Sequence, residues 1–119
     1  MREFTIERQP RESQGLEILK LLGPFTLGAV FEFQEIVRED PAPALIIDMT
    51  DVPYMDSAAL GALLGLQVSC QRHSRRCVLT GVSSRLETVF KVAGVDGIFT
   101  MSTSLEDARE LLAGAPPRV

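Results

Sequence analysis

The chain has 119 residues, of which 45% are hydrophobic and 24% are charged, and its formal net charge is −4 at pH 7. This composition predicts one globular domain with a hydrophobic core and excludes wholesale disorder. The acidic balance disfavours binding to nucleic acid or to an anionic membrane surface, because both would repel it. No apolar run is long enough for a signal peptide or a membrane span, so we expect a cytoplasmic protein without membrane insertion.

Two strands are predicted at the start of the chain. Segment 3–8 alternates apolar and polar residues, and the apolar segment 16–22 ends at the breaker pair Gly23-Pro24. The residues between them, 10–15, are typical of a turn, so the two strands should pair as an antiparallel hairpin.

A helix is predicted from Leu27 to Asp40, with Thr26 as its N-cap and Pro41 as its stop. Apolar residues recur along it at helical spacing and should form the side that packs on the core. These residues are Leu27, Val30, Phe31 and either Ile36 or Val37.

The middle of the chain predicts a buried strand followed by a buried helix. Segment 44–49 is continuously apolar apart from Asp48, which is typical of a central parallel strand that is covered on both faces. The helix that follows, from about Ala58 to His73, is apolar around nearly its whole circumference. Such a helix is buried or partnered, and it leaves room for self-association into a homodimer.

The second half of the chain continues the alternation of strands and helices. The predicted elements are a strand at 77–81, a helix with the capping box Ser84-x-x-Glu87 and a stop at Gly94, a short strand at 98–100, and a final helix that starts from the capping box Thr103-x-x-Glu106.

The order ββαβαβαβα predicts an α/β fold built on a mixed sheet of four to five strands. About four helices should lie mainly on one face, and the termini or a partner should cover part of the other. We expect one domain over residues 1–113 and a short C-terminal tail over 114–119.

Nucleophilic catalysis finds no support in the sequence. The single histidine, His73, lies about 24 Å from Ser57 along the same predicted helix, so it cannot act as a base for that hydroxyl. Cys70 and Cys77 have neither the spacing of metal ligands nor that of a CxxC redox pair, so we interpret them as reduced structural thiols.

Three acids, Asp48, Asp51 and Asp56, follow the central strand. Carboxylates at the carboxyl end of a parallel strand can hold Mg²⁺ or take part in phosphate transfer. No glycine-rich phosphate loop or phosphate-binding lysine accompanies them, so a small phosphate- or nucleotide-handling enzyme is the least favoured hypothesis. We predict no enzyme activity, no cofactor and no metal.

Ser57 precedes an apolar helix, and this position is compatible with two roles. A serine there can cap the helix by accepting a hydrogen bond from a free backbone N–H of the first turn. A phosphate is also well tolerated at a helix N-terminus, because the N–H groups and the helix dipole favour an anion. From the residues alone, the cap and the switch both stay open.

The segment LIIDMTDVPYMDSAALGALLGL resembles the STAS domain family, and within it the bacterial anti-sigma factor antagonists. The match is carried by Asp56, Ser57, Leu60 and Gly61, and by the pattern SxRLxxVFxxAGV at 83–95. The resemblance extends from about residue 3 to residue 112. It implies the same order of elements and a protein without catalysis of its own.

The resemblance also implies a function by partner switching. Family members of this type bind an anti-sigma factor, often itself a serine kinase, and the kinase ends the interaction by phosphorylating a hydroxyl that corresponds to Ser57. An alternative is a constitutive STAS module, for example a subunit of a sensory complex or of a lipid-transport ATPase. The expected partner-binding residues are Tyr54, Met55, Asp56, Ser57, Ala58, Leu60 and Gly61.

Overall fold

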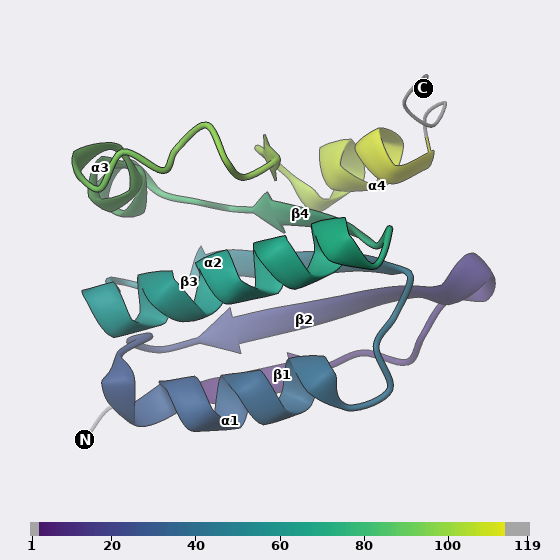
Figure 1. Cartoon of the computed structure of the whole chain (residues 1–119), viewed down its shortest axis with the longest axis horizontal. Coiled ribbons are helices and arrows are strands. Elements are labelled where there is room, and N and C mark those ends of the chain that lie inside the picture. Colours follow the sequence, from purple (N-terminus) through teal and green to yellow (C-terminus); the bar gives the residue numbers. More distant parts are fainter. Residues whose placement is uncertain (1–2, 114–119) are drawn as a thin grey trace.

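The structure is a computed structural model that describes residues 3–113 (Figure 1). Within this range the strands are β1 (Thr5–Arg8), β2 (Leu16–Leu22), β3 (Ala44–Asp51), β4 (Arg76–Thr80) and β5 (Met101–Ser102). The helices of the same range are α1 (Leu27–Arg38), α2 (Ser57–Arg72), α3 (Ser84–Val92) and α4 (Leu105–Ala113), and a short 3₁₀ turn covers Ser13–Gly15. The predicted order ββαβαβαβα is confirmed. The predicted tail at 114–119 lies outside the described residues.

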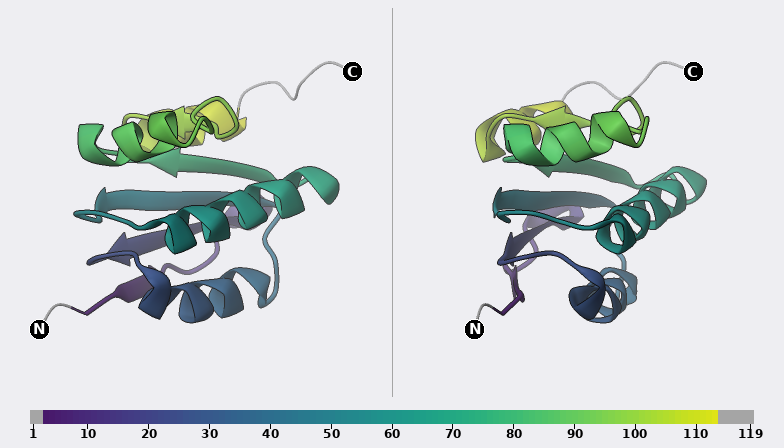
Figure 2. Two further views of the ribbon diagram at one scale, coloured as in Figure 1. Left: turned by 60° about the vertical axis from the view of Figure 1, so that its left-hand side comes forward. Right: turned by 90° about the vertical axis from the view of Figure 1, so that its left-hand side faces the viewer.

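The described strands form one mixed sheet in the order β1-β2-β3-β4-β5. β1 runs antiparallel to β2, and the later neighbours are all parallel, as the hairpin and the buried central strand predicted. Helices α1, α2 and α3 contribute to the core on one face of the sheet, and α4 packs on the other (Figure 2).

Strand β3 is covered on both faces because alternate residues of each strand point to opposite sides. Leu19, Ile47 and Leu79 lie in register across three strands and face the larger helical layer. The residues one position earlier in each strand face α4 instead; they are Ile18, Ile46 and Val78. The predicted burial of the central strand on both sides is therefore confirmed.

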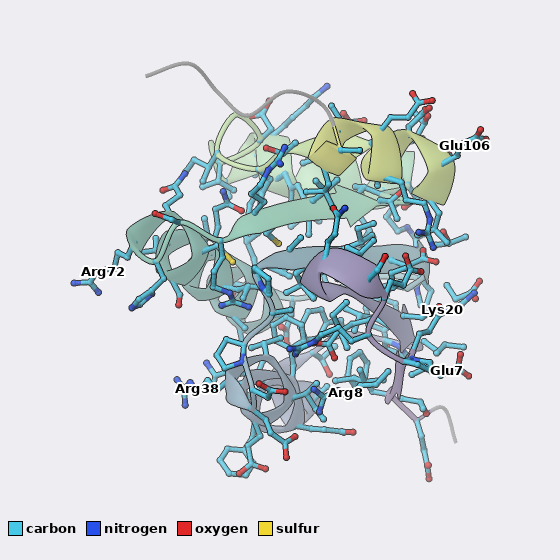
Figure 3. All side chains as sticks on the ribbon, turned by 90° about the vertical axis from the view of Figure 1, so that its right-hand side faces the viewer. Glu7, Arg8, Lys20, Arg38, Arg72 and Glu106 are labelled. Atoms are coloured by element: carbon cyan, nitrogen blue, oxygen red, sulfur yellow. The ribbon has the colours of Figure 1, made fainter. Side chains whose placement is uncertain are left out.

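The face that carries α4 is apolar only where that helix covers it. Glu7 and Lys20 pair across β1 and β2 and project from the same side of the sheet, away from α1 and α2 (Figure 3). An ion pair between Arg109 of α4 and Glu12, with Nη2 to Oε2 at 2.7 Å, fastens the C-terminal helix beside the first hairpin. The C-terminal part of the described chain thus covers this face in part, as predicted.

The buried side of α1 agrees with the predicted one only in part: Val30, Ile36 and Val37 pack against the core cluster, but Leu27 and Phe31 do not. Leu27 and Phe31 are each 70% exposed, whereas Ala29 and Phe33 are 5% and 0% exposed. Because apolar residues occur on two sides of this helix, its spacing pattern was compatible with two rotations. In the structure Ala29 and Phe33 pack on the core, which leaves Leu27 and Phe31 in solvent.

In both helices with a predicted capping box, the residue that caps the helix is the neighbour of the predicted one. Ser83, not Ser84, caps α3, with its Oγ accepting from the N–H of Leu86 at 3.2 Å. Ser104, not Thr103, caps α4, with its Oγ accepting from the N–H of Asp107 at 3.0 Å. Each site offers two adjacent hydroxyl residues, so composition alone does not decide between them.

The last strand also lies later in the chain than predicted, at 101–102 instead of 98–100. Backbone hydrogen bonds from Val95 to Phe90 and from Ile98 to Val95 place the intervening residues in turns. Pairing with β4 then begins at Met101, opposite Leu79.

No helix within residues 3–113 has the length and apolar character needed to cross a membrane.

Candidate functional site

The loops that leave β2 and β3 run side by side and bring two helix N-termini together. Beyond the sheet, the N–H of Phe25 donates to the carbonyl of Tyr54 at 3.0 Å, and the N–H of Asp56 donates back to the carbonyl of Phe25 at 3.2 Å. Phe25 and Met55 form a parallel bridge at this point. As a result α1 and α2 begin at the same end of the molecule (Figure 1).

Asp56 is the N-cap of α2 and also holds the start of α1. Its Oδ1 accepts from the N–H of Ala59, and its Oδ2 accepts from the N–H of Leu27, both at 2.9 Å. Thr26, the predicted cap of α1, has the backbone conformation of a cap, but its side chain makes no capping hydrogen bond. One carboxylate therefore caps two helices.

Ser57 is not the cap of α2. It is the first helical residue, and the capping interpretation fails because Asp56 already binds the N–H of Ala59. The Ser57 side chain is exposed, and its hydroxyl has no hydrogen-bond partner among residues 3–113. The site thus presents an unpaired hydroxyl, at the positive end of a helix dipole, beside a carboxylate that is already engaged.

Residues of α2 and α1 form an open surface next to Ser57. On α2 the exposed residues Gly61 and Gly65 face solvent, and a Cβ built on either glycine would meet no atom within 4 Å. Val68, 50% exposed, continues this side of the helix toward its C-terminus. On α1 the exposed side chains Leu27 and Phe31 add apolar area. We call this surface the α1–α2 outer face; it consists of Leu27, Phe31, Ser57, Ala58, Gly61, Gly65 and Val68.

The predicted partner-binding residues divide between this surface and the core. Tyr54 is 47% exposed, Ser57 and Gly61 are exposed, and Asp56 and Ala58 are half-buried. The other two, Met55 and Leu60, are each 6% exposed and belong to the main core cluster. They support the loop and the helix from beneath.

Two exposed residues of the outer face were missed at the sequence level. The spacing of Leu27 and Phe31 is that of a buried helical stripe, and it predicted packing on the core. The competing signal was the pair Ala29 and Phe33, which has the same four-residue spacing and is the buried one.

The three acids that follow β3 have separate partners. Asp48 accepts from the N–H and the hydroxyl of Thr50, at 3.0 and 2.6 Å. Asp51 lies 3.3 Å from the ammonium group of Lys20, and its hydrogen bond and charge raise the pKa of that lysine. Asp56 caps the two helices. Across residues 3–113, no three acidic, histidine or cysteine side chains are grouped as metal ligands.

His73 lies at the opposite end of α2 from Ser57. It is the C-terminal cap residue of that helix, and its Nδ1 is 2.9 Å from the carbonyl oxygen of Ser69. This placement agrees with the predicted separation of the histidine from the serine.

Comparison with known proteins gives a family and a shared fold. The family model of the STAS domain matches residues 7–108. The anti-sigma-B factor antagonist of Listeria monocytogenes is 31% identical over 97 residues, which cover 80% of this chain and 85% of that protein.

Solved structures of two further proteins superpose on this chain. An anti-sigma factor antagonist from Mycobacterium paratuberculosis has a TM-score of 0.80 at 17% identity, covering 94% of this chain and 96% of that one. The anti-sigma factor antagonist SpoIIAA in its unphosphorylated form has a TM-score of 0.73 at 20% identity, with 97% and 100% covered. SpoIIAA of Bacillus in its phosphorylated form has a TM-score of 0.67 at 20% identity, with 92% and 99% covered. At these identities the superpositions show a common fold.

Proposed function

The chain belongs to the STAS domain family, and from this premise we propose that it is an anti-sigma factor antagonist that works by partner switching. In its unphosphorylated form it binds an anti-sigma factor with serine kinase activity. Phosphorylation of Ser57 by that kinase releases it. The protein acts in the cytoplasm through this protein partner and has no catalytic activity of its own.

The observation that carries this proposal is the position of the Ser57 hydroxyl. It is exposed, it is unpaired among the described residues, and it is part of the α1–α2 outer face. Because Asp56 supplies both caps, a phosphate on Ser57 breaks no hydrogen bond that the fold uses. The phosphate would add about −1.5 to −2 charges at pH 7 where the helix dipole tolerates an anion.

The same phosphate is incompatible with a docked partner. Beside the carboxylate of Asp56 it would place two anionic groups within an interface that also contains Leu27 and Phe31. Burying such a group without a cationic partner is costly, and a penalty of about 3 kcal/mol weakens binding by roughly a hundredfold. Tolerance in the free protein and rejection in the complex are the two properties that a binding switch requires.

The comparisons support the class of partner. The Listeria monocytogenes relative is named for antagonism of an anti-sigma-B factor, and SpoIIAA has been solved in unphosphorylated and phosphorylated forms. We extend both properties to this chain.

Binding from a lysate of the source cells tests the proposal. The wild-type protein and the variants Ser57→Ala and Ser57→Asp are immobilised, incubated with lysate and ADP, and the bound proteins are identified by mass spectrometry. We expect wild type and Ser57→Ala to retain an anti-sigma factor and Ser57→Asp to lose it. The matched control is Ser84→Asp, because Ser84 is also an exposed first residue of a helix, α3. This control should bind like wild type.

Phosphorylation is measured separately by intact mass after incubation with the retained kinase and ATP. We expect one added phosphate in wild type and none in Ser57→Ala. Equal binding by the Ala and Asp forms would contradict the switch and favour the constitutive STAS module. Failure of all forms to retain an anti-sigma factor would contradict antagonism itself.

A further inference from the structure

The two cysteines stand on either side of a very short connection. Helix α2 ends at Arg72 and β4 begins at Arg76, so only residues 73–75 link them. Within this link Ser74 adopts a left-handed conformation, with φ of +56°, and the N–H of Arg75 donates to the carbonyl of Cys70 at 2.8 Å. The chain therefore reverses direction at once, and the last turn of α2 lies over the start of β4.

The side chains of Cys70 and Cys77 point into the same layer. Cys70 is on the buried side of α2 and is 1% exposed. In β4, Cys77 and Leu79 face the core layer under α2, while Val78 between them faces α4. Both cysteines are buried free thiols of the same core cluster, and each influences the pKa of the other. The fold thus juxtaposes two thiols whose spacing in the sequence indicates no such pair.

The surroundings of the pair make the two thiols unequal. The hydrogen bond from Cys77 lowers the pKa of the Cys70 thiol to about 7, and the charges of Arg75 and His73 act in the same direction. The hydrogen bond to Cys70 and burial raise the pKa of the Cys77 thiol. A thiolate is the reactive form of cysteine, so Cys70 is the nucleophile of this pair. Arg75, one of the two residues whose charge lowers the pKa of Cys70, also lines a groove of about 310 Å³ between α1 and α2.

We propose that Cys70 and Cys77 are a redox-active dithiol that a peroxide converts into an intrachain disulfide between the end of α2 and the start of β4. The Cys70 thiolate attacks one peroxide oxygen, the O–O bond breaks, and hydroxide leaves and takes up a proton. Cys77 then attacks the sulfur of the resulting Cys70 sulfenic acid and expels a second water. In total, two thiols and one hydrogen peroxide give one disulfide and two waters.

This modification site is independent of the proposed switch at Ser57, which lies at the other end of α2. The disulfide would fasten the C-terminal turn of that helix to the sheet. It requires no metal, cofactor or partner.

Peptide mapping of the full, reduced protein tests the proposal. The protein is exposed to hydrogen peroxide, remaining thiols are blocked by alkylation, and the sample is digested with trypsin without reductant. Arg72, Arg75 and Arg76 lie between the two cysteines, so trypsin separates them into peptides 39–72 and 77–85. We expect these peptides to be joined in the oxidised sample and to separate on reduction. The intact protein should lose about 2 Da, the mass of two hydrogens, and remain a single chain.

Variants supply the controls. Cys70→Ser should keep an alkylatable Cys77 thiol after peroxide, and Cys77→Ser should lose the Cys70 thiol as a sulfenic acid; neither variant should form the intrachain link. If a serine variant does not fold, the mapping of the wild-type protein still decides the question. Separate peptides with both thiols alkylated, sulfinic or sulfonic acids without a link, or a covalent dimer in place of the intrachain bond would each overturn the proposal.

Discussion

The side chain of Asp56 accepts a hydrogen bond from the backbone N–H of Leu27, which lies 29 residues earlier in the chain, at 2.9 Å. Because the other oxygen of the same carboxylate caps α2, this side chain links the two helix starts directly, in addition to the backbone hydrogen bonds between the loops. Ser57 is the next residue in the chain, so the double cap at Asp56 also fixes the position of the proposed phosphorylation site.

Replacing Asp56 should destabilise the protein more than removing an ordinary cap. A single N-cap contributes about 1 kcal/mol, so we expect Asp56→Ala to lower the free energy of unfolding by about 2 kcal/mol. Asp56→Asn keeps one acceptor oxygen and should lose less. Urea denaturation measures both. The control is Ser83→Ala, which removes the single cap of α3 and should cost about 1 kcal/mol. An effect of Asp56→Ala no larger than that of the control would contradict the double cap.

Changing Ser57 should leave the fold intact. The hydroxyl makes no hydrogen bond among the described residues, and an acid at the first position of a helix is favourable. We therefore expect the free energy of unfolding of Ser57→Asp to lie within about 0.5 kcal/mol of the wild-type value. The same should hold for Ser84→Asp in α3. Urea denaturation of the two variants checks this. A loss above about 1 kcal/mol at Ser57 alone would mean that reduced partner binding reflects unfolding instead of interface rejection.

The exposed apolar side chain of Phe31 should serve binding and not stability. It is 70% exposed on α1, so Phe31→Ala removes little buried area and should change the free energy of unfolding by at most about 0.5 kcal/mol. A large side chain that anchors an interface costs more than about 1 kcal/mol when it is truncated, so if Phe31 is such an anchor, affinity for the anti-sigma factor should fall roughly tenfold. Calorimetric titration measures the affinity.

Val92 is the control for this substitution, because it is 83% exposed on α3, outside the α1–α2 outer face. Val92→Ala should leave affinity unchanged. Equal affinities for wild type and Phe31→Ala would remove α1 from the docking surface.

Two glycines should respond to alanine in opposite directions. Gly61 lies in the interior of α2 with open space around its Cβ position, so Gly61→Ala should stabilise the protein by about 0.5–1 kcal/mol. Gly81 has φ of +74°, and a Cβ there would lie 2.8 Å from the backbone nitrogen of Thr50. Gly81→Ala should therefore destabilise by more than about 1 kcal/mol. Thermal and urea unfolding compare them, and a shared sign would contradict this interpretation.

Disulfide formation should depend on pH through the Cys70 thiol. Cys77, Arg75 and His73 are the groups that lower its pKa to about 7. Because the thiolate reacts, the rate of peroxide-driven disulfide formation should rise as the pH passes through about 7 and then level off. The rate is measured at pH values from 5 to 9 by stopping samples at intervals and mapping them by mass spectrometry. This pH range includes the pKa of an ordinary thiol, about 8.5. A rate that is still rising steeply above about pH 8.5 would indicate an unperturbed thiol.

Much of this architecture follows from local patterns along the chain. The alternation of apolar and polar residues and the continuous apolar runs predict the range 16–22 of β2, the burial of β3 on both faces and the order of the elements. Each of these patterns is complete within a few neighbouring residues. The end of β2 is similarly local, since Gly23-Pro24 stops it. The motif at Asp56 and Ser57 could also be recognised from the sequence, because its residues are adjacent in the chain.

Tertiary contacts decided what depends on residues far apart. Ser57 and Asp56 are both residue types that can cap a helix. Asp56 is the cap in the structure, where its carboxylate accepts hydrogen bonds from the N–H of Ala59 in α2 and from the N–H of Leu27 in α1. Packing on the core also buries Phe33 of α1 and leaves Phe31 exposed. Cys70 and Cys77 meet only because the chain reverses between α2 and β4. The sequence by itself determined which helices and strands form, because each depends on residues that are neighbours in the chain. The tertiary packing determined which side chains are in contact and which are exposed to solvent, because those contacts join segments that are far apart in the chain.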